Sequence, residues 1–381
     1  MPMDVFITDL AAFLPNAPVD NDRMEEVLGM VHQLPSRTRR IILRNNKIER
    51  RHYAIDPATG ATTHSNAELT AEAIRRLRPY PGFTTAAIRC LACGTSSPDQ
   101  TKPGHGSMVH GELAAAPCEV VSTAGVCVAG MTALKYAWMN VAAGLAENAV
   151  ATGSELSSTY LRAQLCGNGP TDADLDAQPQ LAFDADFLRW MLSDGAGAAF
   201  LTTVPPDDRL ALKIEWIEIV SFAHQFEACM YSGAVKNADG SLTGWREFPP
   251  EEALRRHVMH VKQDVKLLNN EIVPTSVART LPPLIEKYGL RPEGIDWFLP
   301  HYSSDYFRRP IHDHLQEIGF PIPFARWFTN LATRGNTGSA SIYLMLEELF
   351  HSGRLQRGER LLLFVPESGR FTISYALLTV V

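Results

Sequence analysis

The chain has 381 residues, of which 45% are hydrophobic and 20% are charged, and its formal net charge is −7. This composition is typical of a globular protein with a sizeable core, and the length predicts two domains or two halves of one large domain. The negative charge gives no bulk basic signal for nucleic acid, and no apolar run reaches the roughly 18 residues of a membrane span. Residues 1–7 lack the basic and apolar regions of a secretory signal. We therefore expect a cytoplasmic protein without nucleic-acid partner or membrane span.

The first predicted elements are a strand-like run at residues 1–7 and a buried strand over residues 87–94. The second strand carries Cys90 and Cys93 in a C-x-x-C spacing, which invites a zinc or redox interpretation. A structural zinc site takes about four ligands, and no second C-x-x-C or paired histidine follows. We interpret both cysteines as structural and expect no metal. All six cysteines are expected to be reduced in a cytosolic chain; they are Cys90, Cys93, Cys118, Cys127, Cys166 and Cys229.

The most informative residue is Cys127, which lies in a run of small residues, STAGVCVAG, that opens a predicted helix over 131–143. Backbone N–H groups and the positive end of the helix dipole favour a thiolate at such a position. Small neighbours let a substrate carbonyl approach the sulfur. The alternative is a buried and inert cysteine, because free cysteine is among the most buried residue types.

Two parts of the chain show a weak internal similarity. Each has a small-residue turn, a helix, a short turn and a buried strand, and each is followed by a final apolar strand. The first set is the turn at 122–130 with strands at 148–155 and 195–201, and the second is the turn at 333–341, a helix over 342–351, and strands at 361–368 and 371–378. This repetition predicts two α/β halves, residues 1–204 and 205–381. The strands are continuous apolar runs, which predicts mixed or parallel sheets covered by helices on both faces.

Less regular stretches separate these parts. Residues 167–180 and 237–250 read as surface loops, and helices are predicted over 250–270 and 276–288. Further along, the buried strand WFLP delivers His301 at its C-terminal end. The turn RGNTGSAS then carries Asn336 at the start of a helix. A cysteine, a histidine and an asparagine at the edges of regular elements are a candidate site for acyl transfer and carbanion chemistry. The alternatives are that His301 is an ordinary core histidine and that Asn336 only caps a helix.

Five segments then occur in a characteristic order: NKIERR at 46–51, the turn around Cys127, SDGAGA at 193–198, Pro300-His301, and GNTGSAS at 335–341. They resemble, in turn, the "G-I-x-x-R" segment, the nucleophile elbow, the "G-D-G-A-G-A" run, the start of "P-H-Q-A-N" and the "G-N-T-S-A-A-S" turn of one family. That family is the β-ketoacyl-ACP synthase III group of condensing enzymes in the thiolase superfamily. The resemblance covers nearly the whole chain.

The resemblance implies a five-layered αβαβα thiolase-like fold of two duplicated halves, a homodimer, and acyl-ACP or acyl-CoA substrates without a cofactor. It implies that Cys127 becomes acylated by a thioester. The N–H groups of Cys127 and Gly369 would form the oxyanion hole. His301 and Asn336 would donate hydrogen bonds to the thioester oxygen of the second substrate and so stabilise its enolate. The predicted reaction is a Claisen condensation that forms a C–C bond through acyl-Cys127.

Three departures from the family pattern refine this prediction. His301 is followed by Tyr-Ser-Ser, residues 367–371 (ESGRF) are not the usual glycine-rich run, and residues 20–29 lack the tryptophan that typical members place against the CoA adenine. We therefore favour a carrier-protein donor, with Arg308 and Arg309 as candidates to meet the acidic surface of an acyl carrier protein; the alternative is a solvated pair. The departures favour specialised metabolism, such as dialkylresorcinol or cyclohexanedione formation or aryl-polyene elongation.

Two other functions stay open. Some relatives move an acyl group to an alcohol or amine without condensation, but those replace the asparagine with an acidic residue, and this chain has Asn336. A catalytically inactive partner subunit is disfavoured because Cys127, His301 and Asn336 are all present. The substrate pocket is expected to come mainly from residues 156–192 and 221–250.

Overall fold

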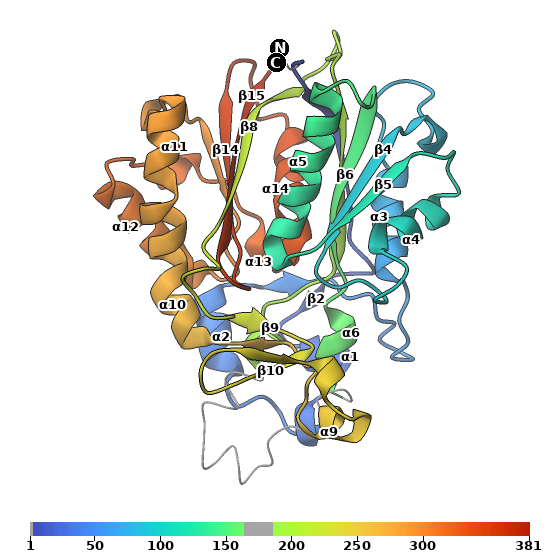
Figure 1. The fold of residues 1–381 in the computed structure, drawn as a ribbon, viewed down its shortest axis with the longest axis vertical. Helices are drawn as coiled ribbons and strands as arrows, with labels where there is room; N and C mark the ends of the chain where they lie inside the picture. Colours follow the sequence, from blue (N-terminus) through green and yellow to red (C-terminus); the bar gives the residue numbers. More distant parts are fainter. Residues whose placement is uncertain (1–2, 164–185) are drawn as a thin grey trace.

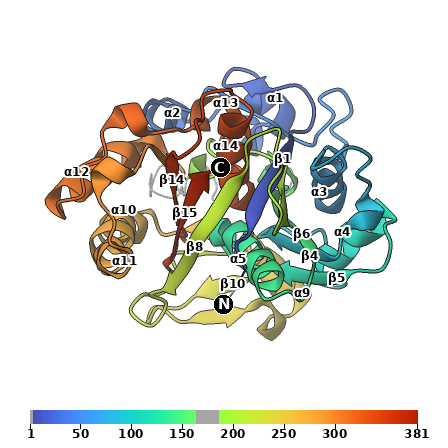
Figure 2. The ribbon, with the colours of Figure 1, turned by 90° about the horizontal axis from the view of Figure 1, so that it is seen from above.

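Five layers of secondary structure make up the protein, in a computed structural model that describes residues 3–163 and 186–381. Figure 1 shows the layers side by side: α10, α11 and α12 on one outer face, a first group of strands, the central helices α5 and α14, a second group of strands, and α3 and α4 on the other outer face. The view from above keeps the same order (Figure 2). The predicted αβαβα fold is confirmed.

The first part of the chain alternates strands and helices. They are β1 (Phe6–Phe13), β2 (Val19–Asp20), α1 (Met24–Leu28), η1 (Val31–Gln33), α2 (Arg39–Asn46), β3 (Arg50–Arg51), α3 (Asn66–Arg75), η2 (Thr85–Ala87), β4 (Cys90–Thr95), α4 (His105–Leu113), β5 (Glu119–Thr123), η3 (Val126–Val128), α5 (Ala129–Ala142), β6 (Asn148–Glu155), α6 (Ser158–Leu161) and β7 (Gly195–Thr202). The strands predicted at 148–155 and 195–201 and the helix after Cys127 are confirmed. Cys90 and Cys93 are fully buried free thiols on β4.

The second part contains longer helical segments and two further small sheets. Its elements are β8 (Leu212–Ser221), β9 (Met230–Tyr231), β10 (Ala234–Lys236), β11 (Leu242–Gly244), η5 (Trp245–Glu247), α9 (Pro250–Arg255), β12 (Lys262–Gln263), α10 (Val265–Val273), η6 (Pro274–Arg279), α11 (Leu281–Tyr288), η7 (Pro292–Gly294), β13 (Trp297–Pro300), η8 (Asp305–Phe307), α12 (Arg308–Glu317), η9 (Phe324–Arg326), α13 (Leu331–Arg334), η10 (Gly338–Ala340), α14 (Ser341–Phe350), β14 (Arg360–Pro366) and β15 (Thr372–Val380). The predicted helix at 342–351 and the strands around 298, 362 and 374 are confirmed.

Within the described residues, the main sheet has nine strands in the order β13-β14-β15-β8-β1-β7-β6-β4-β5. β4 pairs in parallel with both β5 and β6, and β13 pairs in parallel with β14, while the other ladders are antiparallel. The two groups of strands meet at β1 and β8 through only two residue pairs, Phe6 with Lys213 and Ile7 with Leu212. The mixed sheet expected from the apolar strands is confirmed. The division into residues 1–204 and 205–381 stays a prediction.

The central helices approach the sheet very closely. A Cβ atom at Gly153 of β6 would overlap the carbonyl oxygen of Ser339, and one at Gly197 of β7 would overlap the side chain of Tyr343. Glycine is required where another backbone comes this near. The glycines of the run at 193–198 therefore serve packing, as the sequence indicated.

One predicted helix is wrong. Residues 250–270 do not form a single helix: α9 ends after Arg255, His257 takes a positive φ of 50°, and the chain then runs through β12 into α10. Pairing of Lys262 with Tyr231 in β9 competes successfully with local helix propensity here. The predicted helix at 276–288 begins as the π-helical turn η6 and continues as α11.

The two predicted loops have different outcomes. Residues 237–250 contain part of a β10–β11 hairpin and the turn η5, rather than a plain loop. The loop expected at 167–180 lies outside the described residues, as does Cys166. In the portions of the chain that the structure describes, no helix combines the length and the apolar character needed to cross a bilayer.

Candidate active site

Cys127 lies on a strained elbow between β5 and α5. Gly125 has a φ of 124° and Val126 a φ of 29°. A β-branched residue with positive φ is a true backbone outlier, and such strain clusters at functional sites. The sulfur-bearing residue is the middle member of η3 and is 7% exposed. The predicted position at the start of a helix is confirmed, with the N-terminal end of α5 next to the small sheets at the lower end of the molecule in Figure 1.

The environment of Cys127 favours the neutral thiol. Burial raises the pKa of this thiol, and the carboxylates of Glu367 and Glu155 raise it further because they oppose a second negative charge. Hydrogen bonding to the backbone N–H of Cys127 lowers the pKa by less. The backbone N–H favours the thiolate, as expected, but burial and the two carboxylates outweigh this effect. The sulfur must lose its proton as it reacts.

His301 directly follows β13, as predicted. Its backbone N–H donates to the carbonyl of Phe364 at 2.8 Å, which extends the parallel ladder by one residue and fixes the direction of the side chain. The side chain is 4% exposed, and burial lowers the pKa of the imidazole to about 4. The ring is therefore neutral at pH 7 and has one N–H donor and one acceptor. Among the described residues, neither ring nitrogen has a protein partner, so both are available to a substrate.

Asn336 is held by two of the other predicted motifs. Its N–H donates to the carbonyl of Met191 at 3.0 Å, and its carbonyl accepts from Ser193 at 2.8 Å. Beside it, Gly335 has a φ of 72° and lies so close to Ser193 and Arg51 that a Cβ atom would overlap them. The segments 46–51, 193–198 and 335–341 thus meet at one point. They serve to fix the asparagine.

The side chain of Asn336 has one occupied end and one free end. Its Oδ1 accepts from the N–H of Gly338 at 2.9 Å and so stabilises the turn before η10. The Nδ2 group has no partner among the described residues and can donate to a substrate oxygen. The turn η10 packs directly against η3, which carries Cys127. The capping role and the proposed catalytic role are therefore compatible.

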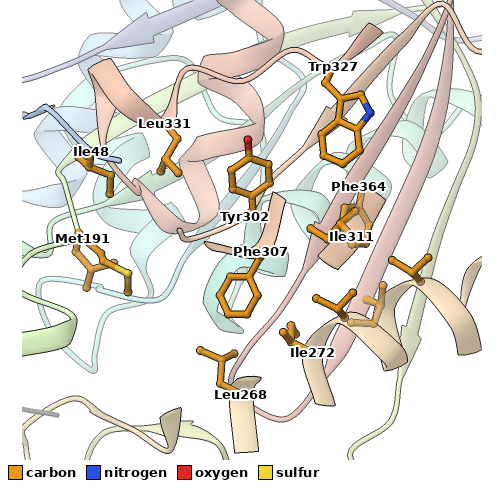
Figure 3. Packing of buried hydrophobic residues seen from close by; sticks show 14 of the residues in the cluster. Ile48, Met191, Leu268, Ile272, Tyr302, Phe307, Ile311, Trp327, Leu331 and Phe364 are labelled. Carbon is orange, nitrogen blue, oxygen red and sulfur yellow. The ribbon is translucent and has the colours of Figure 1, made fainter. Parts of the chain in front are cut away.

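A small cavity brings Cys127 and His301 together. Its volume is about 30 Å³, which is room for one or two water molecules. Its wall is mainly apolar, and Figure 3 shows several of these side chains, from α10, η8 and α12, packed together beside Tyr302. The lining residues are Cys127, Leu268, Ile272, Val273, Ser276, His301, Tyr302, Ser303, Phe307, Ile311, Pro366 and Ser368. Asn336 is not among them. No described residue of 156–192 or 221–250 is among them, and residues 164–185 lie outside the described part of the chain, so the expected source of the substrate pocket stays a prediction.

The predicted oxyanion donor Gly369 is already engaged. Its N–H donates to the carboxylate of Glu367, which also accepts from the N–H groups of Arg370 and Thr372. Glu367 is 5% exposed, and burial raises the pKa of its carboxyl. The structure thus replaces a glycine-rich turn with a turn that is closed around its own carboxylate.

The two predicted carrier-binding arginines differ in their surroundings. Arg309 is exposed, with its Nε 3.6 Å from the Asp313 carboxylate. Arg308 is half-buried and lies over the ring of Phe324, 4.4 Å from the ring centre. The turn η8 precedes these two arginines, and helix α2, which contains further arginines, packs against η8. Arg37, Arg39, Arg40 and Arg44 border an open hollow of about 560 Å³ together with Ser36 and Leu43.

Three residues near Cys127 were not predicted from the sequence. Glu155 ends β6 and accepts hydrogen bonds from Ser96 and Ser97, and Glu367 and Ser368 belong to the turn after β14. The only sequence signal was that ESGRF departs from a glycine-rich run. Within residues 3–163 and 186–381, no group of three or more His, Cys, Asp or Glu side chains is placed to hold a metal ion.

Comparisons with known proteins identify the same relatives from sequence and from structure. Residues 285–377 match the family 3-oxoacyl-[acyl-carrier-protein (ACP)] synthase III C terminal. The β-ketoacyl-[acyl-carrier-protein] synthase III of Clostridium perfringens is 24% identical over 354 residues, which are 92% of each chain. The solved structure of AbyA1, a tetronic acid condensing enzyme, has a TM-score of 0.77 and 22% identity, covering 98% of this chain and 99% of its own.

Another similar structure is OleA of Xanthomonas campestris, solved with bound lauric acid and lauroyl-CoA. It has a TM-score of 0.74 and 18% identity, and the whole of both chains is covered. The layered fold and these likenesses define the class, which is the thiolase-like α/β proteins. Within that class, the chain is similar to the 3-oxoacyl-ACP synthase III-like family, by the family match at residues 285–377 and by relatives that align over most of its length. These relatives are named as β-ketoacyl-ACP synthases III, and the class of acyl-transferring transferases fits the chain.

Proposed function

We propose that this enzyme forms a C–C bond by Claisen condensation through an acyl-Cys127 intermediate. The observation that supports this best is the shared cavity: a buried thiol and a neutral, unpartnered imidazole border the same small apolar space. The turn of Asn336 is packed against the elbow of Cys127. The three groups that condensation needs, a nucleophile and two hydrogen-bond donors, thus lie in one region of the protein.

In the first half-reaction, the sulfur of Cys127 attacks the carbonyl carbon of a donor thioester. A tetrahedral oxyanion forms, and its collapse breaks the bond between that carbon and the donor sulfur. The proton that Cys127 loses ends on the departing thiol. Because the resting residue is a thiol, a proton acceptor is needed during attack, and the neutral ring of His301 is suited to pass the proton on.

In the second half-reaction, the carbonyl oxygen of the acceptor thioester receives hydrogen bonds from His301 and Asn336 Nδ2. These donors stabilise the enolate that forms when the acceptor loses carbon dioxide or an α-proton. The α-carbon attacks the acyl group on Cys127 and expels the sulfur. The sulfur of Cys127 leaves as a thiolate and must regain a proton. If the acceptor is a malonyl group that loses carbon dioxide, this proton comes from solvent. If the acceptor is deprotonated instead, the proton removed from its α-carbon returns the thiol.

The donor is proposed to be an acyl carrier protein. The exposed Arg309 and the arginines of α2 support this proposal, although Arg309 pairs with Asp313, Arg39 pairs with Asp22, and the whole chain has a net charge of −7. Acidic carrier helices and the phosphate of a phosphopantetheine arm are both suited to arginine. CoA thioesters carry phosphates too and are the competing donor. We place this reaction in the cytoplasm.

The product is proposed to belong to specialised lipid or polyketide metabolism, as in the joining of two acyl chains to a dialkylresorcinol or a cyclohexanedione. The fold likeness to AbyA1, a tetronic acid condensing enzyme, and to OleA, whose structure holds lauroyl-CoA, supports this proposal. The apolar wall from α10 and α12 suits a hydrocarbon chain. The small size of the cavity means that these side chains must move apart to admit it.

Product analysis tests the proposed function. The protein is incubated with acyl-carrier or acyl-CoA thioesters, and then with malonyl or β-ketoacyl carriers, and the products are identified by mass spectrometry. A β-keto product with one new C–C bond is expected. Transfer of the acyl group only to an alcohol or amine would replace the proposal with an acyltransferase, and no reaction with any donor would favour a partner subunit.

A further inference from the structure

In the turn after β14, the backbone N–H groups that could bind an oxyanion are already hydrogen bonded. The N–H groups of Gly369, Arg370 and Thr372 all point to the carboxylate of Glu367. Gly369 also does not line the cavity that contains Cys127. A thioester oxygen at Cys127 therefore cannot receive the Gly369 N–H while Glu367 stays in place.

The neighbouring residue Ser368 has the opposite arrangement. It lines the same cavity as Cys127 and His301. Among residues 3–163 and 186–381, its hydroxyl donates only to the sulfur of Met230, with an Oγ–Sδ distance of 3.6 Å. A thioether is a weak acceptor, and a hydroxyl can rotate toward a better one. Little is lost when this O–H turns from Met230 toward an oxyanion.

We propose that the hydroxyl of Ser368, together with the N–H of Cys127, forms the oxyanion hole of this enzyme in place of the Gly369 N–H. The inference rests on the proposed acylation of Cys127. The turn closed by Glu367 presents Ser368 to the cavity while it withholds the backbone donors. Ser368, Cys127 and His301 all line this one small cavity, whose volume is about 30 Å³.

The assigned step is the acylation of Cys127. As the new bond forms between Cys127 sulfur and the carbonyl carbon, the π electrons of the carbonyl move onto its oxygen. The Ser368 O–H donates a hydrogen bond to this oxyanion and keeps its proton. The carbonyl then re-forms, the bond to the donor sulfur breaks, and the donor thiol leaves with the proton from Cys127.

The test compares two reactions of the same cysteine. Acylation passes through an oxyanion, whereas alkylation by iodoacetamide is a displacement at a saturated carbon and forms none. Loss of one oxyanion donor typically costs about 10²- to 10³-fold in rate. We expect Ser368→Ala to slow single-turnover acylation by about 100-fold and to leave the rate of Cys127 alkylation within about threefold of wild type. Ser368→Thr, which keeps a hydroxyl, is expected to recover most of the acylation rate.

Ser232→Ala is the matched control, since the Ser232 hydroxyl donates to the Met259 carbonyl and lies outside the cavity lining. A parallel loss of acylation and alkylation in Ser368→Ala would mean a structural role and would overturn the inference. An acylation rate in Ser368→Ala equal to that of wild type would also overturn the inference, but it would leave the proposed function intact. Absence of any acyl adduct on the wild-type protein would overturn the inference and the proposed function together.

Discussion

At the scale of single residues, the candidate site contains Cys127, the proposed nucleophile, in its neutral form. Burial and two carboxylates raise the pKa of Cys127, and burial lowers the pKa of His301 to about 4. Both side chains are therefore uncharged at pH 7. A neutral pair in an apolar cavity avoids the cost of a buried ion pair. Cys127 and His301 therefore become charged only during reaction with a substrate.

The first residue-scale prediction concerns the charge of Glu367. Its carboxylate raises the pKa of Cys127, so Glu367→Gln should lower that pKa and shift the alkylation profile toward lower pH. In wild type, the rate of Cys127 alkylation should still be rising with pH above 8. Each unit by which the thiol pKa falls increases the thiolate fraction about tenfold below the pKa. We expect faster alkylation of the Cys127 peptide in the variant between pH 7 and 9, measured by mass spectrometry.

Cys118 is an internal control for this experiment, because it is partly exposed and Glu367 is not among the groups that affect its pKa. Its alkylation rate should be the same in both proteins. An unchanged Cys127 profile in Glu367→Gln would show that the carboxylate does not act on the thiol.

The second residue-scale prediction separates the two half-reactions. Asn336→Asp keeps an Oδ1 atom for the Gly338 N–H, so the turn should be preserved. It replaces the Nδ2 donor with an anion beside the enolate. We expect the condensation rate to fall by about 100-fold or more while acylation stays within about threefold of wild type. Acyl-enzyme formation and product formation are followed separately. Equal loss of both half-reactions would contradict this division of roles.

The sequence indicated the identity of the main site residues but not their electrostatics. Small residues around Cys127 and Asn336 are local signals of tight turns, and the apolar run before His301 is a local signal of a buried strand. The pKa of Cys127 is raised first by burial and then by Glu367 and Glu155, which are far from it in the chain. The engagement of Gly369 by Glu367 depends on side-chain direction, which no motif specifies.

At the scale of elements, the site depends on how closely η10 and η3 approach the strands. Ser339 of η10 donates its hydroxyl to the carbonyl of Ser154 at 2.9 Å, and Tyr343 of α14 donates to the carbonyl of Gly130 at 2.8 Å. These bonds link the turn of Asn336 to the elbow of Cys127. Glycine at positions 130 and 153 makes the approach sterically possible.

An element-scale prediction follows for Gly153→Ala. The added Cβ would overlap the Ser339 carbonyl, so η10 must move. Overpacking of this kind typically lowers the free energy of unfolding by about 1–3 kcal/mol. Condensation should fall as well, because the Asn336 turn is displaced. Chemical denaturation and product formation measure the two effects.

Gly111→Ala in α4 is the control for this substitution. A Cβ at Gly111 meets no atom within 4 Å, and alanine in a helix interior is more stable than glycine by about 0.5–1 kcal/mol. That variant should be as stable as wild type or more so. Equal stability of Gly153→Ala and wild type would show that the close approach is not required.

The elements that sequence patterns predicted best are those with long apolar runs. β6, β7, β13 and α14 match their predictions within a few residues. The failure at residues 250–270 has a physical cause: the break at His257 and the β9–β12 pairing depend on a partner strand about 30 residues earlier in the chain. Local propensity carries no information about such a partner.

At the scale of the whole molecule, one edge of the main sheet is open. β5 pairs with β4 on one side only, within the part of the chain that the structure describes. An unpaired edge strand is a template for pairing with another chain. Together with the family resemblance, this supports a homodimer in which two copies of β5 lie side by side.

The homodimer is tested by light scattering after size-exclusion chromatography. We predict the mass of two chains. In a two-fold pairing centred on β5, the middle residue Val121 lies near its own copy, so Val121→Lys places like charges close together and should weaken the dimer. Val204→Lys, at a residue that is 70% exposed in another part of the surface, is the matched control. A wild-type protein that stays monomeric at micromolar concentration would contradict the proposed dimer.

The most direct test of the central claim is intact-protein mass spectrometry of wild type and Cys127→Ala after mixing with acyl-carrier and acyl-CoA thioesters. We predict an acyl adduct on wild type, none on Cys127→Ala, and loss of the adduct with release of a C–C coupled product when a malonyl or β-ketoacyl carrier is added. An adduct that persists on Cys127→Ala, or one that clears without forming a C–C bond, would contradict it.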